Sequence, residues 1–184
     1  MEILTFSGKA ESGKDTSASF FKEKIFKEYS KKSLIIHYAD YLKFICRQYF
    51  GWDGNKDIKG RTLLQQVGSE VVRFRKNQPN FWVDTVGYFI SVFEDDYDYF
   101  LIPDCRYENE IHVLMDDFGY HVLTIKVDRP YHKSSLTLEQ QIHPSETALD
   151  NYNFNYVVTN LEGLDNLSNA IDIFINWGNI CNKL

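Results

Sequence analysis

The segment GKAESGK near the N-terminus holds two glycines and two lysines in seven residues, a composition that suits neither a strand nor a helix. Gly8, Gly13 and Lys14 stand at the spacing GxxxxGK. In this pattern the glycines let backbone N–H groups turn inward around phosphate oxygens, and the lysine neutralises their charge. A helix that follows points its N-terminus at the same anion. The segment therefore predicts a phosphate-binding loop at residues 8–14.

The two residues after this lysine depart from the usual pattern, because Asp15 replaces the Ser or Thr whose hydroxyl normally binds Mg²⁺, and Thr16 comes next. Carboxylate oxygen also suits Mg²⁺, so Asp15 could bind the metal directly or through water, while Thr16 could bond the α-phosphate. Alternatively, Asp15 is a first-turn residue that the helix dipole favours. The sequence leaves both readings open.

A second group of polar residues occurs in IPDCRYENEI, directly after an apolar run. Ligands of open α/β sheets bind beyond the carboxyl ends of the strands, which is where Asp104 and Arg106 would lie. An aspartate there can hold Mg²⁺ or its waters, and an arginine can clamp a phosphoryl group through two hydrogen bonds. The alternative is a turn that caps the next helix, with Glu108 or Asn109 as its polar start.

Apolar, β-prone runs alternate with helix-like segments along the chain. The predicted strands are 3–6, 34–38, 99–102, 121–127 and 156–158. This alternation predicts a parallel sheet with helices on both faces. Such an α/β sheet would bring the two polar groups to one edge, because both follow strands.

Two apolar stripes at helical spacing support the predicted helices. The first, after the glycine loop, consists of Ala18, Phe21, Ile25 and Tyr29. The second consists of Leu64, Val67, Val71 and Phe74.

Two long stretches interrupt the alternation within what we expect to be a single domain over 1–184. Residues 41–95 insert two or three helices between strands, and residues 129–155 are polar and contain Pro130 and Pro144. Long insertions in a compact domain are often lids or binding regions that cover a substrate.

Composition limits the class of protein. The 184 residues fit one domain with a real core. A net charge of −6 argues against a protein that holds nucleic acid by its phosphates. The sequence contains no apolar run of membrane-span length and no signal-peptide pattern, so we expect no membrane association and a cytoplasmic location.

The three cysteines, Cys46, Cys105 and Cys181, are widely spaced and form no CxxC pair. Neither a disulfide framework nor a zinc site is indicated. We interpret them as reduced thiols that pack in the core.

Six segments together resemble the deoxynucleoside monophosphate kinases of the bacteriophage and Gram-positive type. In chain order they are GKAESGKDT, HYADYLKFIC, FGWDG, RTLLQQVGSEVVR, IPDCRYENEI and HPSETALD. The resemblance implies a three-layer P-loop nucleoside-monophosphate-kinase fold with a mainly parallel five-stranded sheet. It also implies that 41–95 binds the acceptor and 129–155 forms a lid. The implied reaction transfers the γ-phosphate of ATP, with Mg²⁺, to a deoxynucleoside monophosphate; for a phage protein the location would be the host cytoplasm.

The resemblance also implies roles at the donor side of the site. The implied ATP-binding residues are Gly8, Gly13, Lys14, Asp15, Thr16 and, near the adenine, Asn160. The implied catalytic residues are Lys14, Asp104, Arg106 and the lid arginine Arg129. Asp15 and Asp104 are the implied metal residues.

At the acceptor side, the resemblance implies a second set of residues. They are Asp40, Lys43, Arg61, Gln65, Gly68, Glu70 and Arg73. Trp52, Trp82 or a tyrosine could stack on the acceptor base. His143, Ser145 and Glu146 match the family pattern HxSE, and we interpret His143 as ordering its loop through a hydrogen bond rather than as a base.

The chain departs from the family at two places: Tyr41 replaces a proline, and Tyr107-Glu108 replace an aromatic-proline pair. Two other functions remain open. One is another small-molecule P-loop kinase, acting on dephospho-coenzyme A or phosphomevalonate. The other is a nucleotide-binding switch that hydrolyses little. The sequence also leaves open which bases are accepted, whether ribose is tolerated and whether the chain forms a homodimer.

Overall fold

A computed structural model describes residues 1–180, so the predicted packing thiol Cys181 lies outside the described residues. The strands are β1 (Glu2–Ser7), β2 (Ser33–Ile35), β3 (Tyr99–Ile102), β4 (Val122–Asp128) and β5 (Tyr156–Thr159). They form one sheet in the order β2-β3-β1-β4-β5, and every pairing is parallel. The predicted five-stranded parallel sheet is confirmed.

The second strand is shorter than the predicted range 34–38, because it ends at Ile35. The backbone N–H groups of Tyr38 and Ala39 donate to the carboxylate of Asp104 instead of continuing the ladder with β3. The side chain after β3 therefore stops β2 and starts the next helix.

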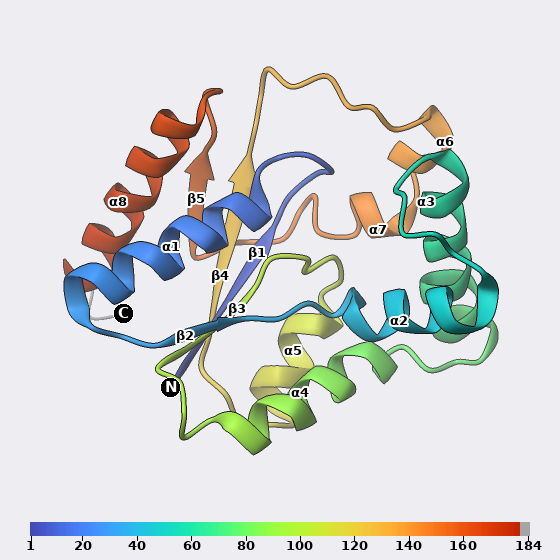
Figure 1. The fold of residues 1–184 in the computed structure, drawn as a ribbon, viewed down its shortest axis with the longest axis horizontal. Helices are drawn as coiled ribbons and strands as arrows, with labels where there is room; N and C mark the ends of the chain where they lie inside the picture. Colours follow the sequence, from blue (N-terminus) through green and yellow to red (C-terminus); the bar gives the residue numbers. More distant parts are fainter. Residues whose placement is uncertain (181–184) are drawn as a thin grey trace.

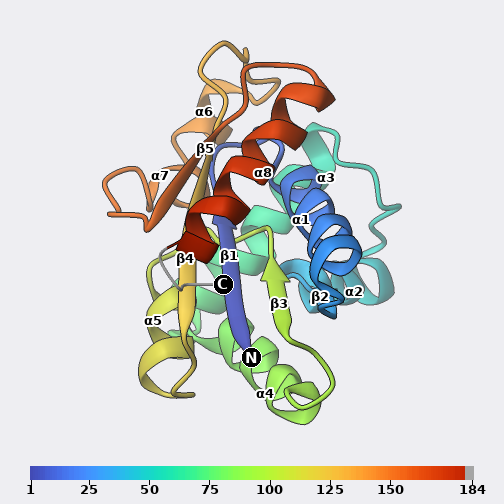
Figure 2. The same cartoon turned by 90° about the vertical axis from the view of Figure 1, so that its left-hand side faces the viewer.

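Helices cover both faces of the sheet, which confirms the three-layer prediction (Figure 2). Helices α1 (Lys14–Tyr29) and α8 (Leu164–Ile180) lie on one face, where Leu4 and Phe6 pack among their apolar side chains. Helices α4 (Phe81–Phe93) and α5 (Asn109–Asp116) lie on the other, against Ile3 and Phe100. Neighbouring residues of a strand point to opposite faces, so Ile3 and Leu4 enter different halves of the core.

The α1 stripe predicted from the sequence is buried at Ala18, Phe21 and Ile25, whereas Tyr29, the last residue of the helix, is exposed. Burial of these three side chains fixes the helix whose first residue is Lys14 against the sheet. The phosphate loop thus sits at the carboxyl end of the central strand β1, which pairs with β3 on one side and with β4 on the other.

The last helix of the inserted range 41–95, α4, packs against the sheet, whereas its other three helices gather at one end of the molecule, away from α8 (Figure 1). They are α2 (Ala39–Phe50), α3 (Ile58–Gln65) and η1 (Gln66–Arg75), a π-helix that continues α3. The apolar stripe predicted at Leu64, Val67, Val71 and Phe74 is wrong at its end, because Phe74 is 56% exposed. A π-helix places residues five apart on one side, so the buried face of η1 carries Gly68, Ser69 and Arg73 instead.

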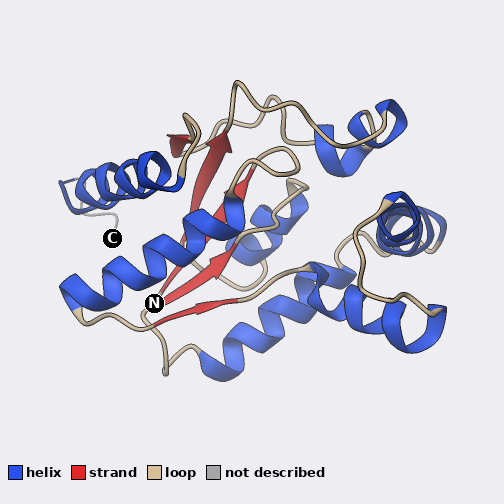
Figure 3. Cartoon of the chain, turned by 45° about the horizontal axis from the view of Figure 1, so that its top comes forward, coloured by secondary structure: helices blue, strands red, loops and turns tan. Residues whose placement is uncertain are grey.

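The segment 129–155 leaves β4, forms α6 (Leu138–Gln141) and returns through α7 (Pro144–Thr147) towards β5 (Figures 1 and 3). Nε2 of Gln140 in α6 donates to the Ile58 carbonyl of α3 at 3.5 Å. Thr137 and Gln140 form a capping box at α6. His143 caps α7, because its Nδ1 accepts from the Ser145 N–H at 3.1 Å. The interpretation of His143 as a loop-ordering residue is confirmed.

Two further sequence expectations can be compared with the described residues. Cys46 and Cys105 are free and buried, which confirms their reading as reduced packing thiols. Within residues 1–180, the helices are all too short or too polar to cross a membrane.

Candidate active site

The phosphate loop needs glycine at both ends. Gly8 has a φ of +144°, and a Cβ there would lie 2.3 Å from the carbonyl oxygen of Val127. Gly13, the N-cap of α1, has a φ of +103°, and its Cβ would lie 2.9 Å from Nδ2 of Asn160. Residues that carry a side chain rarely adopt these φ angles, and their Cβ atoms would collide with β4 and with the loop after β5. The two glycines therefore let the loop run close to the end of β4 and to the side chain of Asn160.

Lys14 is buried at the base of the loop. Its Nζ donates to the carbonyl oxygens of Gly8 at 2.9 Å and Lys9 at 2.7 Å. Burial, followed by repulsion from the Arg106 guanidinium, lowers the pKa of Lys14 to about 7, and the Glu146 carboxylate opposes this shift. An anion at the loop would supply the negative charge that these neutral carbonyls lack.

Asp15 begins α1 next to this lysine and is held by a residue that sequence analysis did not single out. Nε2 of His37 lies 2.9 Å from Oδ1 of Asp15, and its Nδ1 lies 3.3 Å from Oδ2 of Asp40. Burial disfavours protonation of the ring, but the hydrogen bonds with the two carboxylates outweigh it and raise the pKa of His37 to about 9. Protonated His37 thus joins the start of α1 to the start of α2.

Asp104 and Arg106 both lie at the carboxyl end of β3, as predicted, but they face different partners. The two carboxylate oxygens of Asp104 accept the N–H groups of Tyr38 and Ala39, each at 3.0 Å. Nη1 of Arg106 donates to the Ser145 carbonyl at 3.1 Å and to the carboxylate of Glu146 at 2.5 Å. Asp104 therefore organises α2, while Arg106 is attached to α7.

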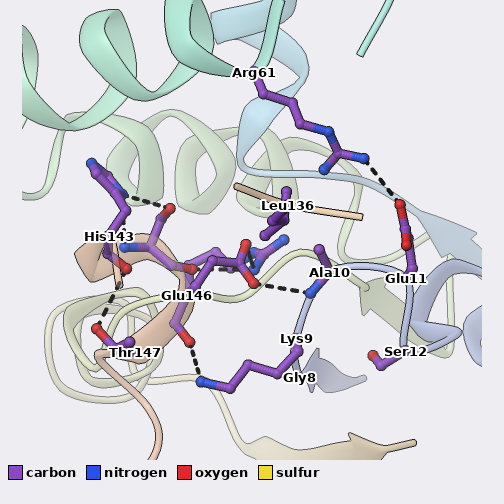
Figure 4. A network of polar contacts seen from close by, with 12 residues as sticks. Gly8, Lys9, Ala10, Glu11, Ser12, Arg61, Leu136, His143, Glu146 and Thr147 are labelled. Carbon is purple, nitrogen blue, oxygen red and sulfur yellow. Dashed lines mark hydrogen bonds and ion pairs between the residues drawn. The ribbon is translucent and has the colours of Figure 1, made fainter. Parts of the chain in front are cut away.

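Glu146 also reaches the phosphate loop (Figure 4). Its Oε2 accepts from the Ala10 N–H at 2.9 Å, and its backbone carbonyl accepts from Nζ of Lys9 at 2.7 Å. The HxSE segment is thus connected to the loop by main-chain and side-chain contacts.

Arg129 and Asn160 border a groove of about 470 Å³ beside the start of α1. The groove also contains Gly13, Lys14, Asp15 and Thr16, all expected at the ATP site. Nη1 of Arg129 donates to the Glu11 carbonyl at 3.1 Å, and Nδ2 of Asn160 donates to the Ser12 carbonyl at 2.9 Å. The structure therefore brings every predicted ATP residue except Gly8 to the groove, and Gly8 lies at the start of the same loop.

Glu11, in the middle of the loop, is the second residue that sequence analysis missed. Its carboxylate lies 3.2 Å from Nη2 of Arg61 and 2.9 Å from Nε2 of His132, and it accepts from Ser135. Arg61, which faces Glu11 in Figure 4, belongs to the insertion, and the other two partners belong to the segment 129–155. Hydrogen bonds from Ser135 and His132 lower the pKa of Glu11. Its signal in the sequence was an acidic residue inside a phosphate-binding pattern.

A second pocket, of about 420 Å³, lies between the loop and the insertion. Predicted acceptor residues at its wall are Lys43, Arg61, Gln65, Gly68 and Arg73. Trp82 also lines the pocket, with its Nε1 donating to the Gly68 carbonyl at 2.9 Å. The structure therefore places most of the predicted acceptor residues around one volume, next to Lys14 and Asp15.

Three predicted candidates lie away from this wall. Glu70 is on the exposed side of η1. Asp40 does not line the pocket but pairs with the lining residue Lys43 at 2.9 Å. Trp52 is buried outside the pocket, with Nε1 donating to the Asn55 carbonyl at 2.8 Å and the Arg47 guanidinium over its ring. Of the two tryptophans, only Trp82 borders the pocket.

Arg73 is part of a buried polar cluster at the far wall of this pocket. It forms an ion pair with Glu110, donates to the Pro79 carbonyl at 2.8 Å, and lies over the Tyr107 ring at 4.3 Å. Burial raises the pKa of Glu110, and the Arg73 guanidinium opposes the shift. The hydroxyl of Tyr107 lies 2.8 Å from Oγ of Ser69. The cluster thus ties η1 to the segment after β3.

Solved structures share this fold at low sequence identity. The APS kinase of Mycobacterium tuberculosis in complex with AMPPNP and APS aligns with a TM-score of 0.54 and 10% identity, over 95% of this chain and 97% of that one. A sugar kinase from Janibacter sp. HTCC2649 aligns with a TM-score of 0.56 and 11% identity, over 98% and 95% of the two chains. Among curated proteins, none matches this sequence significantly. The structural likeness establishes a P-loop kinase fold.

A family model described as deoxynucleotide monophosphate kinase matches residues 27–171, which is more than half of the chain. The match begins after the phosphate loop, so the loop and the family match are separate observations. The matched residues include the insertion, the strand that precedes Asp104 and Arg106, and the segment 129–155. The chain therefore belongs to the deoxynucleotide monophosphate kinase family, and its activity is the phosphoryl transfer of a nucleotide kinase.

Proposed function

We propose that this kinase transfers the γ-phosphate of ATP to a deoxynucleoside monophosphate. The observation that carries the proposal is that the groove and the pocket share Glu11, Lys14 and Asp15. ATP would lie in the groove, with its γ-phosphate at Lys14, and the acceptor would lie in the pocket with its phosphate at the same point. The pocket volume of about 420 Å³ falls within the usual range for small-molecule sites.

Lys14 and the loop N–H groups would hold the β- and γ-phosphates, with phosphate oxygens replacing the carbonyls that Lys14 now contacts. Arg106 and Arg129 border the loop together and would neutralise charge as it moves to the acceptor. The closed segment 129–155 would exclude water, so that ATP is not hydrolysed.

The monophosphate and the base-bearing sugar of the acceptor would be bound by Arg61, Lys43 and Gln65. Trp82 would offer an aromatic face. Arg73 would support this wall through Glu110. Asp40 would act at the entrance through Lys43, and Glu70 would act only if the insertion moved.

The residues at the start of α1 fit a magnesium ion. Asp15 has a side chain that is 75% exposed and hydrogen-bonds through Oδ1. Mg²⁺ needs few protein ligands when phosphates and waters supply the rest, and bound there it would offset the charge of the transferred phosphoryl group. Asp104, whose oxygens already accept two N–H groups, would contact the waters of the ion.

The cytoplasmic location and the homodimer stay predictions.

The test is ADP release with ATP and Mg²⁺ across the four deoxynucleoside monophosphates and their ribose counterparts. We expect one or more deoxynucleotides to stimulate release, and EDTA to abolish it. If only dephospho-coenzyme A or phosphomevalonate stimulates release, the acceptor assignment is wrong. ATP binding without stimulation by any acceptor would instead indicate a nucleotide-binding switch.

A further inference from the structure

One carboxylate joins the phosphate loop to the arginine expected to stabilise the transferred phosphoryl group. The side chain of Glu146 is only 8% exposed, and its two oxygens have different partners. Oε2 accepts from the Ala10 N–H at 2.9 Å, and Oε1 accepts from Nη1 of Arg106 at 2.5 Å. Glu146 therefore holds a residue of the phosphate loop with one carboxylate oxygen and a residue of the segment after β3 with the other.

The charges around Glu146 explain why a carboxylate is needed at this place. Lys14 and Arg106 are cations that border the same pocket, and the Arg106 guanidinium disfavours protonation of Lys14. The Glu146 carboxylate has the opposite effect on Lys14 while contacting Arg106. A buried group of this charge keeps both cations close together, whereas a neutral amide would leave their repulsion uncompensated.

The contacts also fix the direction of Arg106. Both of its protein contacts, to Glu146 and to the Ser145 carbonyl, use Nη1. Among residues 1–180, Nε and Nη2 have no hydrogen-bond acceptor. These donors are therefore available to an anion at the loop, and a guanidinium can bind a phosphoryl group through two of them.

We propose that Glu146 is a positioning residue for phosphoryl transfer, acting through Arg106. It holds the guanidinium by one nitrogen against the phosphate loop and leaves the other donors for the phosphoryl group. This inference rests on the proposed function, in which Arg106 stabilises the charge of that group. Misplacing such a group by about 1 Å costs roughly 100-fold in rate, so the effect belongs in kcat.

The experiment is a double-mutant cycle with Glu146→Gln, Arg106→Ala and the double variant. Glutamine keeps the shape and an acceptor for the Ala10 N–H but removes the charge. We expect Glu146→Gln to lower kcat by roughly 10- to 100-fold with the KM for ATP changed less than about threefold. The double variant should match Arg106→Ala, because Glu146 has nothing to position once the guanidinium is gone.

Asp150→Asn is the matched control. Asp150 follows α7, the helix that contains Glu146, and pairs with the loop residue Lys9 at 2.5 Å, but both side chains are about half exposed. We expect wild-type kcat from this variant, since exposed ion pairs contribute little. Losses that multiply in the double variant, or full kcat in Glu146→Gln, would overturn the inference.

The proposed function and this inference fail in different ways. If no nucleotide stimulates ADP release by the wild-type protein, the proposed function is wrong. The same cycle is then measured on the free energy of unfolding by urea denaturation, where a loss in the double variant smaller than the sum of the two single losses supports the pairing of Glu146 with Arg106, and additive losses reject it.

Discussion

The phosphate loop and the acceptor pocket meet at Lys14 and Asp15, yet they are built in opposite ways. The loop is a continuous run of residues 8–14 whose shape depends on its own backbone, with glycine at both ends. The pocket is assembled from α2, η1, α4 and the turn after β3, which are far apart in the sequence. Its far wall depends on the buried pair of Arg73 and Glu110.

This difference separates two kinds of residue. A loop residue affects phosphate binding directly, so its substitution should change the rate without changing the fold. A residue of the acceptor wall holds distant elements together, so its substitution should change stability or acceptor binding. The first three of the four predictions below test this division, and the fourth measures how little stability one loop side chain contributes, from the largest expected effect to the smallest.

Lys14→Ala should lower acceptor-dependent ADP release by about 1,000-fold, because the phosphates lose their buried counter-charge. The free energy of unfolding should change little, since within residues 1–180 the Lys14 ammonium hydrogen-bonds only to carbonyls and the Ser12 hydroxyl of its own loop. Lys22→Ala, an exposed position on the same helix, is the control. Normal turnover by Lys14→Ala would show that phosphoryl transfer does not depend on the charge of this loop residue.

Arg73→Leu should lower the free energy of unfolding by about 3 kcal/mol, because it leaves the buried Glu110 without its ion-pair partner. Urea denaturation measures this change. The control is Glu23→Gln, which removes a pair between exposed side chains on α1 and should leave the unfolding midpoint unchanged. Unchanged stability of Arg73→Leu would show that the wall does not depend on this pair.

Ser69→Ala should raise the KM for the acceptor roughly 2- to 10-fold, the equivalent of one hydrogen bond. The substitution removes the partner of the Tyr107 hydroxyl at 2.8 Å, within the wall of the pocket. The KM for ATP should stay the same, because neither residue borders the groove. An equal change in both KM values would mean that the two sites are not separable.

Glu11→Gln should lower stability at pH 7 by less than about 1 kcal/mol, since its side chain is 34% exposed and its ion pairs are screened. The pKa of Glu11 is lowered in the folded state by Ser135 and His132. Its contribution is therefore present above the unfolded value of 4.5 and is lost as pH falls through the lower folded value. Urea denaturation at pH 7 and near pH 4 should show the difference between variant and wild type shrinking with acid.

The fold was predictable where local pattern and burial agree. The five strands and the α1 stripe follow from period and composition, because each buries a continuous apolar face. The η1 helix was not predictable, because the pattern at 64–74 fits an ordinary helix, whereas the π-helix buries Arg73 and exposes Phe74. The buried arginine is paired with Glu110, so its burial depends on a residue far away in the sequence.

The sequence by itself determined the phosphate loop, the alternation of strands and helices, and the polar residues that follow β3. Those features depend on backbone geometry and on neighbours within a few residues. Only the tertiary structure decided the partners of the charged side chains. Arg106 lies 40 residues from its partner Glu146, and Arg73 lies 37 residues from Glu110. These contacts therefore exist only once the sheet has brought their elements together. The pairing of buried charges, rather than their presence, is what folding added to this site.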